Sequence, residues 1–282
     1  MNSMPTLIRR EFWEHKPLWI APLVVSLCLV LISAVIAGEI TLPAFEGRLQ
    51  SGPNAVGAQA FFKSGILIGV ILFQFMIASI VVSFYLLDCL YSERKDRSIL
   101  FWKSLPVSDT STVLSKFAVA SVVMPLGVFL LAGITSLLAA GIVTLRADGL
   151  APHVWDTALW LRAYGTFFVA LIAGMLWYTP VIAYLMLVSA WARGSVFMWA
   201  FLPPFGLALL ESYAFGSHYV AGFLKYRLGF PVSIFVGTKP EGTMPHLNIP
   251  EFLASPALWI GMAAAALLLF GAIRIRRFRD DT

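Results

Sequence analysis

The 282-residue sequence predicts an all-α integral membrane protein, with one transmembrane domain over residues 1–282 and six spanning helices. Two observations carry this prediction. The composition is 59% hydrophobic and only 12% charged, far from the values of a soluble globular protein. The hydrophobic residues also gather in runs long enough, or nearly so, to cross a hydrocarbon core of about 30 Å as helices. These runs cover residues 18–38, 64–87, 117–145, 163–192, 196–210 and 252–273.

The distribution of basic residues predicts the orientation of these spans. With both termini in the cytoplasm, the inside segments hold 13 of the 20 Lys and Arg residues, although the outside loops are longer. Such an excess on the cytoplasmic side is typical of membrane proteins. We therefore expect a multi-pass protein of the inner (plasma) membrane with both termini cytoplasmic. The pI of about 9.3 reflects the excess of Lys and Arg over Asp and Glu. Because the basic residues lie mainly on the predicted cytoplasmic side, we expect membrane lipids as partners and not nucleic acid.

The segment before the first span, residues 4–19, predicts an N-terminal interfacial amphipathic helix. Leu7, Ile8, Phe12 and Trp13 alternate there with charged residues at helical spacing. A helix of this kind lies in the plane of the headgroups, with its apolar side chains buried in the lipid. An ordinary charged tail is the alternative. At the other side of the membrane, residues 211–251 form a long loop with many large apolar side chains. This composition predicts re-entrant or interfacial outer segments before the last helix.

The residues that the spans lack also narrow the function. No Lys, Arg, Asp, Glu or His lies in the interior of a predicted span. Ion-coupled carriers commonly need such a group, so this class becomes less favoured. The sequence also has no Gly-x-x-x-x-Gly-Lys-Ser/Thr loop for ATP and no catalytic or metal-binding set within the spans. We expect no enzyme activity, metal or cofactor in this chain, and we interpret Cys28 and Cys89 as packing residues.

One long, densely charged segment, residues 91–116, lies between the second and third spans. A mixed-charge cluster opens it, and residues 98–104 then form a predicted short helix that places Ile99, Trp102 and Leu105 on one face. Pro106 ends this helix because proline cannot continue the hydrogen-bond ladder. Ser108 or Asp109 then caps the helix that leads into the third span. A membrane-surface helix is the alternative interpretation of the same segment.

This segment resembles the coupling-helix loop of a type-2 ABC transporter permease, the membrane subunit of an exporter whose ATPase is a separate chain. The shared features are a Glu-Arg pair, a Ser, an apolar helix and a Ser-Leu-Pro-Val-Ser motif. Here they are Glu93-Arg94, Ser98, Ile99–Trp102 and Ser104–Ser108. The six-span plan, the amphipathic N-terminal helix and the outer segments before the last span agree with this family. The resemblance covers most of the chain, but only the loop has a distinctive motif.

The resemblance implies a cytoplasmic ABC ATPase subunit that binds ATP and Mg, and a second permease copy or paralogue. It also implies that the cytoplasmic coupling helix docks on the ATPase, with Phe101, Trp102 and Leu105 as buried anchors. The implied docking residues are Glu93, Arg94, Arg97, Ser98, Ile99, Phe101, Trp102, Lys103, Leu105 and Pro106. The expected function is export of a hydrophobic or amphiphilic substrate. The alternatives are an ion-coupled secondary transporter and a non-transporting membrane scaffold or sensor.

Polar side chains within the predicted spans are candidates for the substrate path. They are Gln74, Ser79, Ser83, Tyr178, Thr179 and Tyr184. Hydrogen bonds between packed helices are the other interpretation, and the more common one for such residues.

Overall fold

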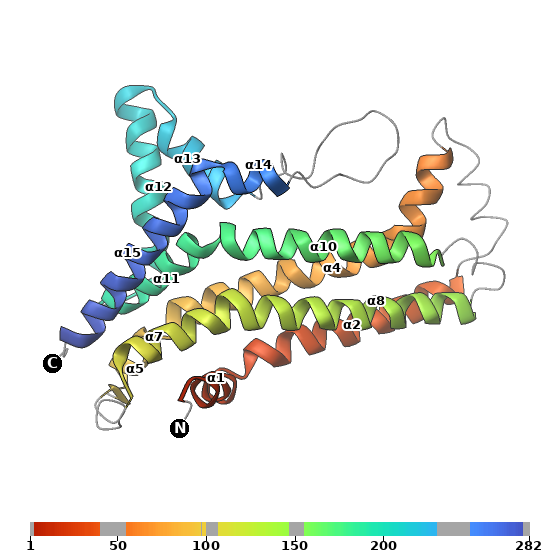
Figure 1. The fold of residues 1–282 in the computed structure, drawn as a ribbon, viewed down its shortest axis with the longest axis horizontal. Coiled ribbons are helices and arrows are strands. Elements are labelled where there is room, and N and C mark those ends of the chain that lie inside the picture. Colours follow the sequence, from red (N-terminus) through yellow and green to blue (C-terminus); the bar gives the residue numbers. More distant parts are fainter. Residues whose placement is uncertain are drawn as a thin grey trace.

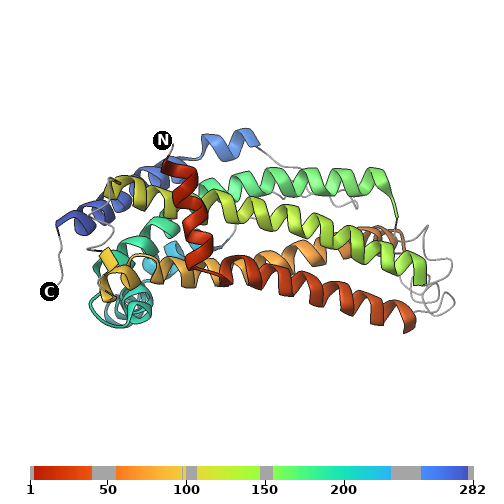
Figure 2. The same ribbon diagram turned by 90° about the horizontal axis from the view of Figure 1, so that it is seen from below.

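The structure, a computed structural model, describes residues 3–39, 55–96, 98–99, 107–146, 155–229 and 249–278. This part of the chain is helical and contains no strand, as the sequence predicts. Six helical segments are long and apolar enough to cross a membrane. Figure 1 shows α2, α4, α8 and α10 running side by side along the long axis of the molecule. Both termini lie at one end of this bundle, which we call the terminal end (Figures 1 and 2).

The first half of the chain builds most of the bundle. Its helices are α1 (Ser3–Glu14), α2 (Pro17–Glu39), α4 (Ala55–Asp88), α5 (Tyr91–Lys95), α7 (Asp109–Ala118) and α8 (Met124–Arg146). The helix α1 lies across the terminal end of the bundle, at a steep angle to the other helices (Figure 2). The predicted N-terminal helix is therefore present, although shorter than the predicted segment. Its place at a membrane interface stays a prediction.

A π-helical turn, η1 (Val119–Val123), joins α7 to α8 within one continuous helix. Pro125 explains it, because proline has no N–H for the carbonyl of Ser121 and its ring crowds that residue. A π-helical turn is one way in which a helix accommodates a missing backbone hydrogen bond. The Ser121 hydroxyl stays within the helix and donates to the Phe117 carbonyl at 2.7 Å. At the start of α7 the Ser108 side chain accepts from the Ser111 N–H, which confirms the predicted cap.

The second half begins with α10 (Thr157–Trp177) and α11 (Thr179–Trp191), which together correspond to the predicted fourth span. They separate at Tyr178, one residue before the helical turn that contains Pro180. The helix α12 (Val196–Phe215) continues through Pro203 and Pro204 and ends at Gly216, whose φ of 63° is the left-handed conformation that favours glycine.

Short helices follow α12 before the last span. The helix α13 (Tyr219–Leu228) turns back beside α12, and the two form a hairpin that projects from the bundle (Figure 1). After residues outside the described part come α14 (Ile249–Ala254) and the last long helix, α15 (Pro256–Phe278). The predicted outer segments are therefore short helices where the structure describes them. Their position relative to a membrane stays a prediction.

Three groups of buried side chains hold the helices together. The largest lies toward the terminal end and includes Leu18, Leu86, Val113 and Met186 from four different helices. The second joins α2, α4, α8 and α10 farther along the bundle. The third packs α10 against α14 and α15 around Trp177. Outside these groups, large apolar side chains cover the long helices and face outward, as expected where lipid is the solvent.

Candidate functional site

Charged side chains from four helices meet inside the terminal end of the bundle. Glu11 of α1 and Lys116 of α7 have no exposed surface, and Glu93 of α5 and Arg276 of α15 are almost as deeply buried. Buried charges are rare unless they are paired. We call Glu11, Glu93, Lys116 and Arg276 the charge cluster.

Short ion pairs connect the members of the charge cluster. Lys116 Nζ donates to both oxygens of the Glu11 carboxylate at 2.9 Å and lies 3.1 Å from Glu93 Oε1. The other Glu93 oxygen accepts from Nη1 of Arg276. Arg276 Nε also donates to Asp109 Oδ1 at 3.1 Å, at the first residue of α7. Glu93 lies at the start of residues 91–108, which we call the polar loop, and Asp109 follows this loop directly. Both are therefore bonded to the last helix.

Two further side chains complete the pairing of the cluster's carboxylates. Arg10 Nη2 lies 3.0 Å from Glu11 Oε1 and 3.2 Å from Glu93 Oε1. The Tyr85 hydroxyl, from α4, donates to Glu11 Oε2 at 2.9 Å. Three carboxylates, counting Asp109, thus face three cations. Charge-assisted hydrogen bonds of this length are the strong ones, and a buried group that loses its partner is strongly unfavourable.

The short helix α5 is also held by the end of α11. The Ser189 hydroxyl accepts from the backbone N–H groups of Leu90 and Tyr91, both at 3.1 Å. In return, Arg94 Nη2 donates to the carbonyls of Ser189 at 2.9 Å and Ala192 at 2.8 Å. A cation is favourable at the carboxyl end of a helix, where carbonyls lack helical partners. The start of the polar loop is thereby fixed to the end of α11 as well as to α15.

The structure describes four of the ten predicted docking residues. Glu93 and Arg94 point into the protein, and Ile99 is buried. The Ser98 hydroxyl donates to the Glu93 carbonyl at 3.3 Å. These contacts indicate that the four side chains stabilise the position of the loop. Their role in docking an ATPase stays a prediction. The other six lie outside the described residues: Arg97, Phe101, Trp102, Lys103, Leu105 and Pro106.

His15 follows α1 and borders the charge cluster. Its ring packs edge-on against Tyr85 at 4.8 Å between centroids, and its Nε2 lies 4.0 Å from Glu11 Oε2. Burial lowers the pKa of His15 from its usual 6.5; Lys116 lowers it further, while Glu11 opposes the shift. Glu11, Glu14 and His15 bring ligand atoms within 4.8 Å of one another. A metal ion does not fit there, because Lys116 already occupies both Glu11 oxygens and would repel it.

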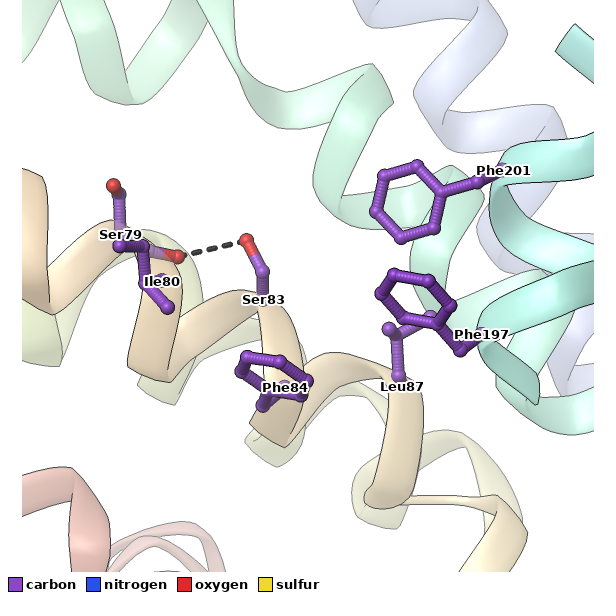
Figure 3. A pocket seen from close by; sticks show the side chains of 7 residues that line it. All are labelled: Ser79, Ile80, Ser83, Phe84, Leu87, Phe197 and Phe201. Atoms are coloured by element: carbon purple, nitrogen blue, oxygen red, sulfur yellow. Dashed lines mark hydrogen bonds between the residues drawn. The ribbon is translucent and has the colours of Figure 1, made fainter. Parts of the chain in front are cut away.

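A shallow hollow of about 230 Å³ lies between α4 and α12. Ser79, Ser83 and three apolar side chains of α4 line it, together with Phe197 and Phe201 of α12 (Figure 3). The two serine hydroxyls donate within α4, to Met76 and Ser79 carbonyls at 2.7 Å. Their protons are therefore already used, and the hollow presents mainly apolar surface.

The other predicted path residues lie elsewhere and bond to neighbouring backbone or side chains. Gln74 is buried between helices, and its Nε2 donates to hydroxyls of Ser26 and Thr135. Tyr184 donates to the Ala200 carbonyl at 2.9 Å, and Tyr178 donates to the Leu228 carbonyl at 3.3 Å. Thr179 donates within its own chain segment, to the Leu176 carbonyl. Of the six, the structure brings only Ser79 and Ser83 together at a hollow.

The sequence analysis missed the charge cluster as a unit. The signal was present, because Glu11, Glu93, Lys116 and Arg276 each lie near the same predicted end of a different span. When acidic and basic side chains lie at helix ends beside an apolar bundle, those that become buried are expected to form ion pairs with one another. Residue order alone does not show which of these groups turns inward.

No known protein family, curated protein or solved structure matches this chain.

Proposed function

We propose that the chain is the transmembrane permease subunit of an ATP-driven ABC exporter. It moves a hydrophobic or amphiphilic substrate out of the cytoplasm or the inner leaflet, in an inner (plasma) membrane with both termini cytoplasmic. A separate ATPase subunit docks on residues 91–108 and binds ATP and Mg. A second permease copy or a paralogue completes the complex, and this chain itself is not an enzyme.

The observation that carries this proposal is the charge cluster. It joins the start of the polar loop at Glu93 and its far end at Asp109 and Lys116 to α1 and α15. Because these pairs are buried and closely spaced, a displacement of the loop shifts several helices together rather than bending the loop alone. A loop that only lies on the membrane surface has no need for such a connection.

The hollow between α4 and α12 supports the expected class of cargo. Its wall is apolar apart from two serine hydroxyls whose protons are bonded within α4. Such a surface favours an alkyl chain or another apolar group over an ion or a sugar.

Docking and transmission are tested with different variants. Trp102→Ala and Leu105→Asp are expected to release a co-purifying ATPase while the spans remain inserted. Glu93→Gln is expected to retain the ATPase but to lower ATP-driven transport of a fluorescent phospholipid in proteoliposomes at least tenfold. Lys95→Gln is the matched control, because Lys95 lies on the same helix and is exposed.

Two results would contradict the proposal. The first is transport by the lone chain under an ion gradient without ATP, which indicates a secondary carrier. The second is an unchanged ATPase content in the Trp102 and Leu105 variants, which removes the docking role from this loop.

A further inference from the structure

A second cationic site lies at the end of α15 that is far from the charge cluster. There the carboxyl end of α13 meets the break between α10 and α11. Trp177 Nε1 donates to the Arg227 carbonyl at 3.2 Å, and the Tyr178 hydroxyl donates to the Leu228 carbonyl at 3.3 Å. These bonds satisfy carbonyls that have no partner within α13. The end of α13 is thereby fixed in place.

The Arg227 side chain extends from this junction to the first turn of α15. Its guanidinium carbon lies 4.4 Å from the centroid of the Trp177 ring, and Nη1 donates to the Ala257 carbonyl at 3.3 Å. The residue is only 7% exposed, and its buried Nη2 atom has no hydrogen-bond partner. Among the described residues, no carboxylate pairs with it. A buried guanidinium without a counter-charge is unfavourable, so this site favours an anion.

An independent observation at the same turn also indicates a ligand. Ser255 immediately precedes α15, where a serine hydroxyl ordinarily accepts from an N–H group of the first turn. Here the buried Ser255 Oγ has no hydrogen-bond partner. The N-terminus of a long helix carries a partial positive charge and binds phosphate groups readily. The guanidinium, which contacts Ala257 and Gly261, and the Ser255 hydroxyl therefore both lie near the start of α15.

The site lies near the start of α15, whereas Arg276 of the charge cluster lies near the end of the same helix. Ala257 precedes Arg276 by 19 residues, which at 1.5 Å per residue is about 28 Å and close to the thickness of the hydrocarbon core. The two sites are therefore separated by most of the length of α15. Figure 1 shows the start of α15 beside α13 and α14, away from the C-terminus.

Several residues next to the two unpartnered atoms are exposed. Neighbouring residues Leu228, Ala254 and Pro256 are exposed, as is Trp259 one turn into α15. Gly261 lets the guanidinium lie directly against α15, because a Cβ atom at this position would overlap it. Nη2 is the guanidinium atom nearest to Gly261, so a ligand oxygen reaches it when the end of α13 moves away from α15.

We propose that Arg227, Ser255 and the first turn of α15 bind a phosphate group at the membrane surface opposite the charge cluster. The guanidinium donates to two phosphate oxygens, the serine hydroxyl donates to one, and the helix N-terminus adds its partial charge. The phosphate belongs to the headgroup of an anionic phospholipid. This site is independent of the ATPase and of the docking loop.

The test uses the purified full-length chain alone, in detergent, with three probes. They are dioleoylphosphatidylglycerol, inorganic phosphate and dioleoylglycerol, which has the same acyl chains without phosphate. Binding is measured by native mass spectrometry for the lipids and by thermal shift for all three. We compare the wild type with Arg227→Gln, Ser255→Ala and the control Lys225→Gln, which removes an exposed charge from the same helix.

The expected result is that phosphatidylglycerol binds the wild type and Lys225→Gln equally, and Arg227→Gln at least tenfold more weakly. Ser255→Ala is expected to lose less, and dioleoylglycerol to show no difference among variants. A wild-type shift with inorganic phosphate that Arg227→Gln lacks supports the same site with free phosphate as its ligand.

Equal lipid binding by Arg227→Gln and the wild type overturns the proposal. Equal losses in Arg227→Gln and Lys225→Gln also overturn it, because they indicate attraction to general surface charge. If Arg227→Gln does not fold, Ser255→Ala and Arg227→Lys replace it in the test. Wild-type affinity for phosphatidylglycerol in both of these variants overturns the proposal. Failure here leaves the proposed exporter function intact, since no ATPase takes part.

Discussion

Lys116 is a cation that has no contact with water, although it lies where a span begins. Its ammonium group has three donors, and two carboxylates surround it. The stability of this arrangement depends on both signs being present together. Single substitutions within the charge cluster therefore test it more sharply than any substitution at the surface.

Lys116→Met is expected to destabilise the folded protein by about 3–5 kcal/mol, because it leaves two buried carboxylates without their shared cation. The measurement is thermal or denaturant unfolding of the purified protein in detergent. Lys16→Met is the matched control, since Lys16 is exposed. Equal stabilities of the two variants would show that the charge cluster contributes little.

His15 predicts a pH dependence of stability. Its pKa is lowered in the folded state, so below about pH 6.5 the unfolded chain binds a proton that the folded chain does not. The stabilisation that neutral His15 gives the folded state is present above the pKa of the unfolded chain. It is lost as the pH falls through the lower pKa of the folded chain. Glu11, Glu14, Asp88, Glu93 and Lys116 are the charged groups facing or near the ring.

His15→Gln is therefore expected to lose less stability than the wild type when the pH decreases from about 7 to about 5.5. Unfolding curves at several pH values measure this. His218→Gln, at the start of α13, is the control. A wild-type pH slope in His15→Gln would remove His15 as the cause.

Among the helices, α8 and α10 make an unusually close contact at Gly133. The Tyr164 side chain of α10 lies where a Cβ atom of residue 133 would be, its hydroxyl donates to the Phe129 carbonyl at 3.0 Å, and its ring stacks on Phe129. Small residues allow membrane helices to approach closely in this way.

Gly133→Ala is expected to lower the unfolding temperature, because Tyr164 must leave its place and its hydrogen bond. Gly127→Ala, on the same helix, has open space around it and is expected to stabilise the protein by up to about 1 kcal/mol through helix propensity. Opposite shifts in unfolding temperature are the expected outcome. A decrease in both variants would mean that the helix backbone, not the contact, is sensitive to substitution.

Helix positions were largely predictable because each span is a long apolar run bounded by charged or turn-forming residues. The Ser108 cap followed from a serine placed before a new helix. The break at Tyr178 was less predictable in detail, since Pro180 indicates a distortion but not the residue at which the ladder stops. Gly133 gave no signal at all, because the contact depends on a partner 31 positions away along the chain.

At the scale of the whole molecule, the six helices long and apolar enough to cross a membrane agree with the sequence analysis, while pairings between distant residues could not be predicted. The Glu93–Arg276 contact joins positions 183 residues apart, and an apolar periodicity carries no information about it. The candidate site was therefore predicted as a loop, but its buried anchorage was not.

The topology predicts that Trp13 lies on the cytoplasmic side of the membrane and Trp155 on the opposite side. In a Cys28→Ser, Cys89→Ala background, a cysteine replacing Trp13 is expected to react with a membrane-impermeant maleimide only in inside-out vesicles. A cysteine replacing Trp155 is expected to react only in right-side-out vesicles. Both positions are exposed in the protein. The reverse pattern would invert the proposed topology and remove the cytoplasmic loop.

The position of Arg276 near the end of the chain has a consequence for biosynthesis. Until α15 is synthesised, the carboxylates of Glu11, Glu93 and Asp109 face only the two cations Arg10 and Lys116, so the nascent chain passes through a stage in which the cluster lacks one cation. A chain terminated before α15 is expected to remain loosely assembled and to be cleaved faster by limited proteolysis than the complete chain. Arg276 supplies the last cation of the cluster, so the assembly of the earlier helices at the terminal end depends on α15.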